Sequence, residues 1–169
     1  PLPLDNMNEN IICADALVSY DTNGQPYPTP WPDADIIIGN PPFQSKNKMQ
    51  EEYGQAYISV LQHLYGDIVP GRADFCVYWF PRAHNHLPPG GRAGLVAPDT
   101  IRQNYSRQGS LDYIVAHGGT ITDAVSSQKW PGEAAVFISI ACWVKGPHTG
   151  PFTLWAENEK NGNTNLEAY

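Results

Sequence analysis

The stretch Asp35-Ile36-Ile37-Ile38-Gly39-Asn40-Pro41-Pro42-Phe43 decides the fold, because a short isoleucine run ends there at a turn signal. Such a run is typical of a buried strand in a parallel sheet, and open α/β sheets bind their ligands at the carboxyl edge of these strands. The two prolines favour extended backbone and have no N–H to donate. The corner is therefore expected to be stiff, with acceptors on the Asn40 side chain and the Pro41 carbonyl beside the ring of Phe43. This arrangement suits a planar base that carries an exocyclic amino group.

The charge of the chain is acidic and uneven. Residues 1–70 hold nine acids and two bases, a balance of −7, whereas residues 71–169 hold eight of each. Because affinity for nucleic acid comes largely from Lys and Arg on phosphates, this chain is expected to bind duplex DNA poorly without help from another domain. The 169 residues contain no apolar run long enough for a membrane span, and three cysteines without metal-ligand spacing favour a reduced, cytoplasmic protein. The start at Pro1 suggests a fragment of a longer chain.

Alternating strand and helix patterns predict an α/β fold. Strands are expected over 10–17, 36–39, 92–98, 120–125 and 134–144, the last two as an antiparallel hairpin, and helices over 49–65, 73–86 and 101–117. The proline-rich residues 20–33 predict an extended loop. Residues 1–146 are predicted to be one catalytic unit, and the polar stretch 147–169 a linker toward a further region.

The sequence Asn40-Pro41-Pro42-Phe43 after a hydrophobic strand resembles the catalytic motif of DNA adenine-N6 methyltransferases. Further stretches resemble the methyltransferase region of fused restriction-modification enzymes of the MmeI type, and the resemblance covers roughly residues 10–145. These stretches are Tyr-Gly-Asp-Ile-Val-Pro-Gly at 65–71, Ala-Asp-Phe-Cys-Val-Tyr-Trp-Phe at 73–80, Arg-Ala-Gly-Leu-Val-Ala at 92–97 and Trp-Pro-Gly-Glu-Ala-Ala-Val at 130–136.

The resemblance implies a Rossmann-like class I sheet, S-adenosylmethionine as cofactor, and methylation of adenine N6 in a base flipped out of duplex DNA. It implies cofactor contacts from Asp15, Ala16, Asn40 and Phe75, and base contacts from Phe43 and Trp130. One departure concerns the glycine-rich loop that holds the methionine part of the cofactor. That loop and its strands do not occur in these residues, so the sheet is expected to be incomplete, the chain inactive alone, and the remaining domains of the same polypeptide necessary.

Several residues also have a purely structural interpretation. Asp15 fits a cap, Phe75 fits core packing, and Trp130 fits a plug at the end of the sheet. The stripe of Tyr53, Tyr57, Leu61 and Leu64 on the helix over 49–65 is predicted to belong to the core.

Two further functions remain open from the sequence. One is the same chemistry on another acceptor, such as an RNA guanine amino group or a protein glutamine amide, and the other is a non-catalytic module that docks DNA or a partner. The letters His84-Asn85-His86 lack the additional ligands that a metal nuclease needs, so no metal site is expected.

Overall fold

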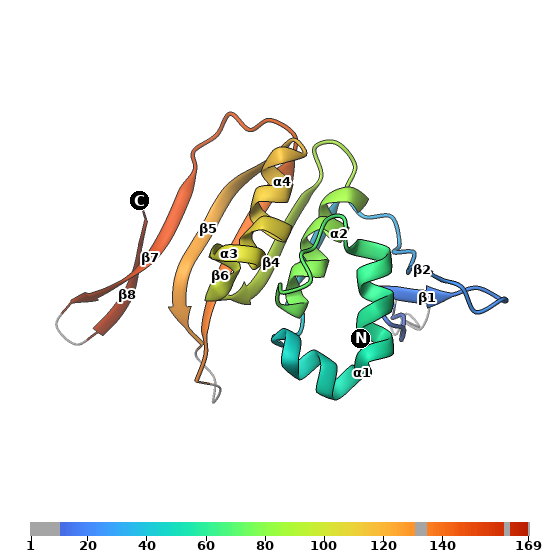
Figure 1. Cartoon of the computed structure of the whole chain (residues 1–169). Helices are drawn as coiled ribbons and strands as arrows, with labels where there is room; N and C mark the ends of the chain where they lie inside the picture. Colours follow the sequence, from blue (N-terminus) through green and yellow to red (C-terminus); the bar gives the residue numbers. More distant parts are fainter. Residues whose placement is uncertain (1–10, 131–134, 161–162, 169) are drawn as a thin grey trace, which may run out of the picture.

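The structure is a computed structural model that describes residues 11–130, 135–160 and 163–168. Its centre is a six-stranded sheet in the order β3-β4-β6-β5-β7-β8 (Figure 1). The strands are β3 (Ile36–Gly39), β4 (Arg92–Pro98), β5 (Gly119–Lys129), β6 (Phe137–Lys145), β7 (Thr153–Lys160) and β8 (Asn163–Ala168). A separate two-stranded sheet pairs β1 (Val18–Tyr20) with β2 (Pro26–Pro28).

Strands β3 and β4 run parallel, with Gly39 opposite Leu95, so both end at the same edge of the sheet. Strand β6 is antiparallel to both β4 and β5. The predicted strands at 36–39 and 92–98 are therefore confirmed, and so is the antiparallel hairpin, although β5 continues past residue 125 to Lys129 and β6 begins at Phe137 rather than at residue 134. The hairpin brings residues from late in the chain to the edge at which β3 ends.

Strand β3 is not buried as its isoleucine run predicted. Ile36 is 67% exposed and Ile38 is 83% exposed, and among the described residues β3 pairs only with β4. Side chains alternate between the two faces of a strand, and Ile37 packs against the core, so Ile36 and Ile38 point to the opposite face. Their burial needs a second layer on that face, which the described residues do not place over these two side chains.

The helices are more broken than the sequence patterns predicted. Helix α1 (Lys46–Tyr65) is interrupted at Gly54, whose φ of 80° and ψ of 162° are non-helical, and its bend is visible in Figure 1. The predicted helix over 73–86 consists of the 3₁₀ turn η2 (Phe75–Tyr78) and α2 (Trp79–His86). The predicted helix over 101–117 is a succession of short pieces: η3 (Asp99–Arg102), α3 (Asn104–Arg107), the π turn η4 (Gln108–Asp112) and α4 (Tyr113–Ala116).

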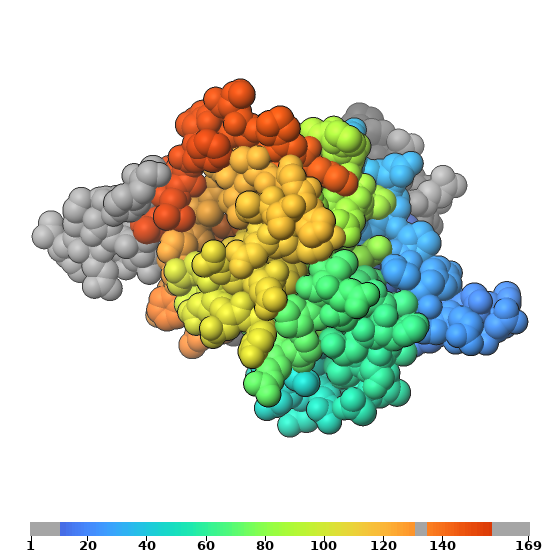
Figure 2. All heavy atoms as spheres, turned by 45° about the horizontal axis from the view of Figure 1, so that its top comes forward, coloured from blue at the N-terminus to red at the C-terminus, as the bar shows by residue number. Residues whose placement is uncertain are grey.

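Helices α2, α3 and α4 lie on one face of the sheet, where the main core forms (Figure 1). Phe80 of α2 stacks on Trp143 of β6 with ring centroids 5.8 Å apart. The segment 104–112 also packs against residues 69–77, as the adjoining surfaces in Figure 2 show. Gly109 makes this contact possible, because a Cβ there would lie 3.0 Å from both Pro70 and Val77.

Two expectations for the amino-terminal part of the chain were wrong, and the stretch predicted to be a linker contains strands, while its role as a linker remains a prediction. Residues 11–17 form no regular strand; instead the Asp15 carboxylate accepts hydrogen bonds from the N–H groups of Leu17 and Val18, which produces a turn ahead of β1. The predicted loop over 20–33 contains β2, and the predicted linker contains β7 and β8.

Strand β7 pairs in parallel with β5, from Asp123 opposite Thr153 to Val125 opposite Trp155, and β8 pairs with β7. Strand pairing uses backbone groups that every non-proline residue has, so a polar composition did not exclude it. The end of the catalytic part at residue 146 remains a prediction. Within the described ranges, no helix has the length and apolar character needed to cross a membrane.

Candidate active site

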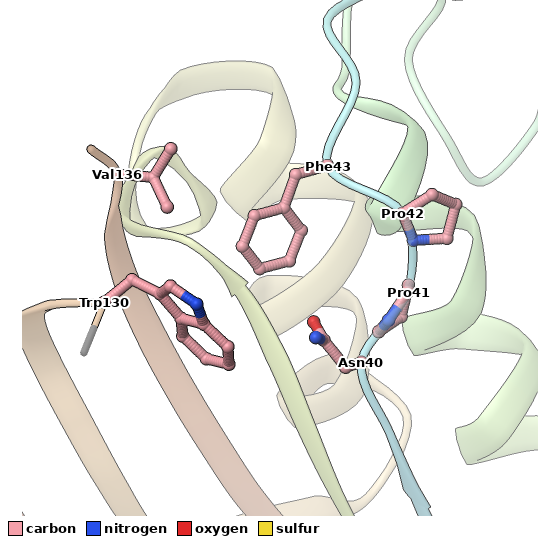
Figure 3. Close-up of a pocket in the computed structure, with 6 residues that line it drawn as sticks. All are labelled: Asn40, Pro41, Pro42, Phe43, Trp130 and Val136. Atoms are coloured by element: carbon pink, nitrogen blue, oxygen red, sulfur yellow. The ribbon is translucent and has the colours of Figure 1, made fainter. Parts of the chain in front are cut away.

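A hollow of about 270 Å³ lies at the carboxyl end of β3 (Figure 3). The segment that follows β3 and the β5–β6 hairpin both contribute to it. Its lining residues are Asn40, Pro41, Pro42, Phe43, Trp130 and Val136. The backbone N–H of Trp130 donates to the Val136 carbonyl at 2.9 Å, which fixes the end of the hairpin that faces the β3 corner. The fold thus joins two segments that are far apart in the sequence.

The side chains of Asn40, Phe43 and Trp130 point toward a common space (Figure 3). Asn40 is exposed, whereas Phe43 and Trp130 are half-buried, so the amide and both rings remain accessible. Pro41 and Pro42 have no N–H, so their backbone offers this corner only carbonyl acceptors. The Asn40 side chain adds an amide oxygen as a further acceptor. The structure therefore gathers all the residues that the sequence assigned to base binding and catalysis; their chemical roles remain predictions.

The corner is tied to the layer of helices behind it. The backbone N–H of Phe75 donates to the Gln44 carbonyl at 2.9 Å, and the Gln44 side-chain amide donates to Glu52. Within the described chain, the buried Oε1 atom of Gln44 has no hydrogen-bond partner. These contacts hold the residue after Phe43 against η2 and α1.

A second group of residues lies around Asp15. The Tyr57 hydroxyl donates to Asp15 Oδ2 at 2.7 Å, and the Tyr57 ring lies 6.4 Å from the ring of Phe75. The Tyr53 ring is 5.4 Å from Tyr57 and 5.3 Å from Phe75. Burial and then the Asp15 carboxylate raise the pKa of the Tyr57 phenol, so this hydroxyl stays protonated and remains a donor. Two of the predicted cofactor residues, Asp15 and Phe75, are thus connected through Tyr57.

In the described part of the chain, the other two predicted cofactor residues, Ala16 and Asn40, make no side-chain contact with Asp15 that parallels the one from Tyr57. Ala16 is half-buried, and its carbonyl accepts a hydrogen bond from the Trp31 indole at 2.8 Å, which fixes the backbone next to Asp15. Asn40 lies in the hollow rather than among the contacts of Asp15. Phe75 is only 3% exposed and is surrounded by aromatic rings, in agreement with its structural interpretation.

Sequence reasoning missed Tyr57 as the hydrogen-bond partner of Asp15, and Tyr53 as the ring next to Tyr57. Leu61 of the same stripe is fully buried and Leu64 is half-buried, as predicted, but Tyr53 is 40% exposed and Tyr57 is half-buried. A hydroxyl-bearing ring on an otherwise apolar stripe was the available signal, because a partly buried tyrosine hydroxyl usually has a hydrogen-bond partner.

The histidines of the His84-Asn85-His86 stretch are engaged in packing. His84 Nε2 lies 3.2 Å from the carbonyl oxygen of His117, and His86 Nε2 lies 2.8 Å from that of Pro32. Among the described residues, no group of His, Cys, Asp and Glu side chains has an arrangement that could hold a metal ion. These rings attach α2 to α4 and to the segment after β2.

Comparison with known protein families gives one match, which covers residues 33–117, just over half of the chain. The matching model describes the Eco57I restriction-modification methylase. This chain belongs to that family. The matched segment runs from the approach to β3 through the Asn40–Phe43 corner and α2 to α4. Comparison with curated proteins finds no match.

Solved structures similar to this family member share its fold. The restriction-modification enzyme MmeI, solved in complex with DNA, matches with a TM-score of 0.62 and 20% identity over 79% of this chain and 18% of its own. A modification subunit of a putative type I restriction enzyme from Vibrio vulnificus YJ016 matches with a TM-score of 0.52 and 16% identity, over 76% of this chain and 26% of its own. A putative class I S-adenosylmethionine-dependent methyltransferase from Listeria monocytogenes matches with a TM-score of 0.51 and 14% identity, over 72% and 36%.

These likenesses confirm the predicted Rossmann-like class I methyltransferase fold. The chain spans between 18% and 36% of the length of the three solved chains.

Proposed function

We propose that this chain is the base-binding part of a DNA methyltransferase that transfers a methyl group from S-adenosylmethionine to adenine N6. The observation that carries the proposal is the hollow in which the Asn40 amide meets the rings of Phe43 and Trp130. Its volume of about 270 Å³ is slightly below the range of pockets for drug-sized ligands, and such a space suits a single base. Membership of a restriction-modification methylase family supports DNA as the substrate.

The corner residues would act on the amino group through fixed dipoles. An exocyclic amine is a poor nucleophile because its lone pair is delocalised into the ring. If Asn40 Oδ1 and the Pro41 carbonyl each accept one of its hydrogens, the nitrogen becomes more tetrahedral and its lone pair is directed away from the ring. No residue has to become charged, and preorganised dipoles of this kind each contribute on the order of a few kcal/mol.

The two aromatic side chains would hold the base outside the duplex. Extrusion of a base costs about a few kcal/mol in lost stacking and pairing. Stacking on Phe43 and contact with Trp130 would offset part of this cost, and the half-buried position of both rings leaves their faces available. The rings would also keep water away from the amino group.

The described residues fit one part of S-adenosylmethionine. The Asp15 carboxylate accepts from Tyr57, whose ring is grouped with those of Tyr53 and Phe75, a combination that suits an adenine ring and its amino group. When bound, the cofactor would supply an electrophilic methyl group on a sulfonium. Asp15, Ala16 and Phe75 are the residues of this chain that we assign to its adenine side.

Other parts of the full-length protein would supply the remaining contacts. The chain carries a net charge of −7, so we assign most of the phosphate contacts with duplex DNA to other domains. Ile36 and Ile38 expose a large apolar area on the face of β3 opposite to Ile37, which suits packing against a further part of the same polypeptide.

The test is methyl transfer by the full-length protein with Asn40→Ala, using labelled S-adenosylmethionine and unmethylated genomic DNA. Loss of one preorganised hydrogen-bond acceptor is expected to reduce the rate by about a hundredfold or more. Asn23→Ala is the matched control, because Asn23 is exposed in the turn between β1 and β2. Unchanged methylation by the Asn40 variant would refute the proposal.

Mass spectrometry of nucleosides and peptides from cells that express the protein separates the possible acceptors. N6-methyladenine in DNA is the expected product. A methylated RNA guanine or protein glutamine would identify the same chemistry on another acceptor. Absence of any methylated product from the full-length protein would favour a non-catalytic docking module.

A further inference from the structure

We infer that Tyr57 is a positioning residue that aligns the Asp15 carboxylate for the amino group of an adenine ring. The inference deepens the proposed function and depends on it, because the adenine ring is that of the bound cofactor. It rests on the hydrogen bonds of Asp15 and on the aromatic rings next to it.

The Asp15 carboxylate is held at both oxygens. Oδ1 accepts from the backbone N–H groups of Leu17 at 2.8 Å and Val18 at 3.2 Å, and Oδ2 accepts from the Tyr57 hydroxyl at 2.7 Å. A carboxylate offers about four lone-pair sites, and three of them are used here. The remaining site is on Oδ2. A single free acceptor on an immobilised carboxylate can recognise one N–H donor with a defined direction.

The Tyr57 ring belongs to an aromatic cluster with Tyr53 and Phe75. The three ring centroids are separated by 5.3, 5.4 and 6.4 Å. Phe75 is buried, Tyr57 is half-buried and Tyr53 is 40% exposed, so the cluster runs from the core to the surface, and its member Tyr57 contacts the exposed Asp15. Aromatic rings next to a directed acceptor suit a flat heteroaromatic ring that bears an amino group.

The bend in α1 contributes to this arrangement. Tyr53 and Tyr57 are four residues apart, but Gly54 between them has a φ of 80°, which non-glycine residues rarely adopt. Two hydrogen bonds at the other end of the helix region hold it in place, from Tyr65 Oη to the Leu17 carbonyl at 2.6 Å and from Gln62 to Tyr78 Oη at 2.7 Å. The Tyr57 hydroxyl is thereby fixed relative to the turn that contains Asp15.

The test measures how the full-length protein discriminates between two ligands that differ at the amino group. S-adenosylhomocysteine carries this group, and S-inosylhomocysteine has a carbonyl oxygen in its place. Calorimetric titration gives both dissociation constants for the wild type and for Tyr57→Phe. Loss of a hydrogen bond that orients a charged group is expected to weaken S-adenosylhomocysteine binding about five- to tenfold, with little change for the inosyl ligand.

Tyr113→Phe is the matched control. It also removes one hydrogen-bonded tyrosine hydroxyl, but that hydroxyl donates to Asn85 Oδ1 at 3.1 Å and has no contact with the Asp15 turn. Any change in affinity that it causes should be equal for the two ligands. Asp15→Asn is the positive control and should remove or reverse the preference for the adenosyl ligand.

The outcomes distinguish this inference from the proposed function. A lower preference in Tyr57→Phe, with the ratio unchanged in Tyr113→Phe, supports the inference. Equal weakening of both ligands in Tyr57→Phe, or no change in either, overturns it and leaves the proposed function intact. Absence of S-adenosylhomocysteine binding to the wild type would instead overturn the proposed cofactor.

Discussion

Replacement of Phe43 by alanine is expected to impair methyl transfer while leaving the fold intact. Phe43 is half-buried, lines the hollow and is absent from the buried core cluster. Stacking of one base on an aromatic side chain contributes about 1–3 kcal/mol. Because Trp130 stays in place, we expect the lower part of this range, about 1–2 kcal/mol, which is a decrease in kcat/KM for DNA of about five- to thirtyfold.

The size of the stability change separates this effect from unfolding. Phe43→Ala should lower the free energy of unfolding by only about 1 kcal/mol. Phe80→Ala provides the contrast, because Phe80 is completely buried and its ring stacks on Trp143 at 5.8 Å. Removing a buried phenylalanine costs about 3–5 kcal/mol, so this variant should lose activity through unfolding.

The assay combines urea denaturation of both variants with initial rates of labelled methyl transfer into unmethylated genomic DNA. The reasoning is refuted if Phe43→Ala retains a kcat/KM within about twofold of the wild type at unchanged stability. A large loss of stability in Phe43→Ala would show instead that this ring belongs to the core.

Three further predictions concern stability and pairing, each measured by urea denaturation of the full-length protein. Gly54→Ala should lower the free energy of unfolding by about 1–3 kcal/mol, because φ is +80° even though no atom lies within 4 Å of the added Cβ. An unchanged free energy of unfolding would mean that α1 can adopt a helical φ at this residue without cost. Burial lowers the pKa of His84, so the unfolded chain binds this proton more readily, and stability should fall as the pH drops below about 6.5. A decline of the same slope in His84→Gln would contradict this assignment. Ile38→Lys should lower the free energy of unfolding by more than about 1.5 kcal/mol, because a further part of the full-length protein is expected to cover this face of β3; a change within about 0.5 kcal/mol would show that the side chain stays exposed.

The sequence predicted the elements whose signals are local. The isoleucine run before Gly39 and the strand over 92–98 were located from their apolar patterns, and the β5–β6 hairpin from two apolar stretches with a turn between them. The proline pair at 41 and 42 marked the stiff corner, because proline restricts the backbone wherever it occurs. The accessible position of Asn40 followed from that corner.

The sequence misjudged elements whose state depends on partners elsewhere in the chain. The segment 10–17 has the composition of a strand, but its Asp15 side chain binds the nearby backbone and turns the chain instead. The polar stretch 153–160, inside the predicted linker, forms a strand because its backbone pairs with β5 and β8. A local sequence pattern shows neither which strand a segment will pair with nor which strand will lie at the edge of the sheet.

The sequence by itself determined the chemistry of the corner at Asn40–Phe43, because the residue types and the two prolines fix its acceptors and its stiffness. Only the tertiary structure decided what faces that corner. Trp130 reaches the hollow through the antiparallel pairing of β5 with β6, and Tyr57 reaches Asp15 through the path of α1. Both contacts join residues that are distant in the chain, and their geometry arises from the packing of whole elements.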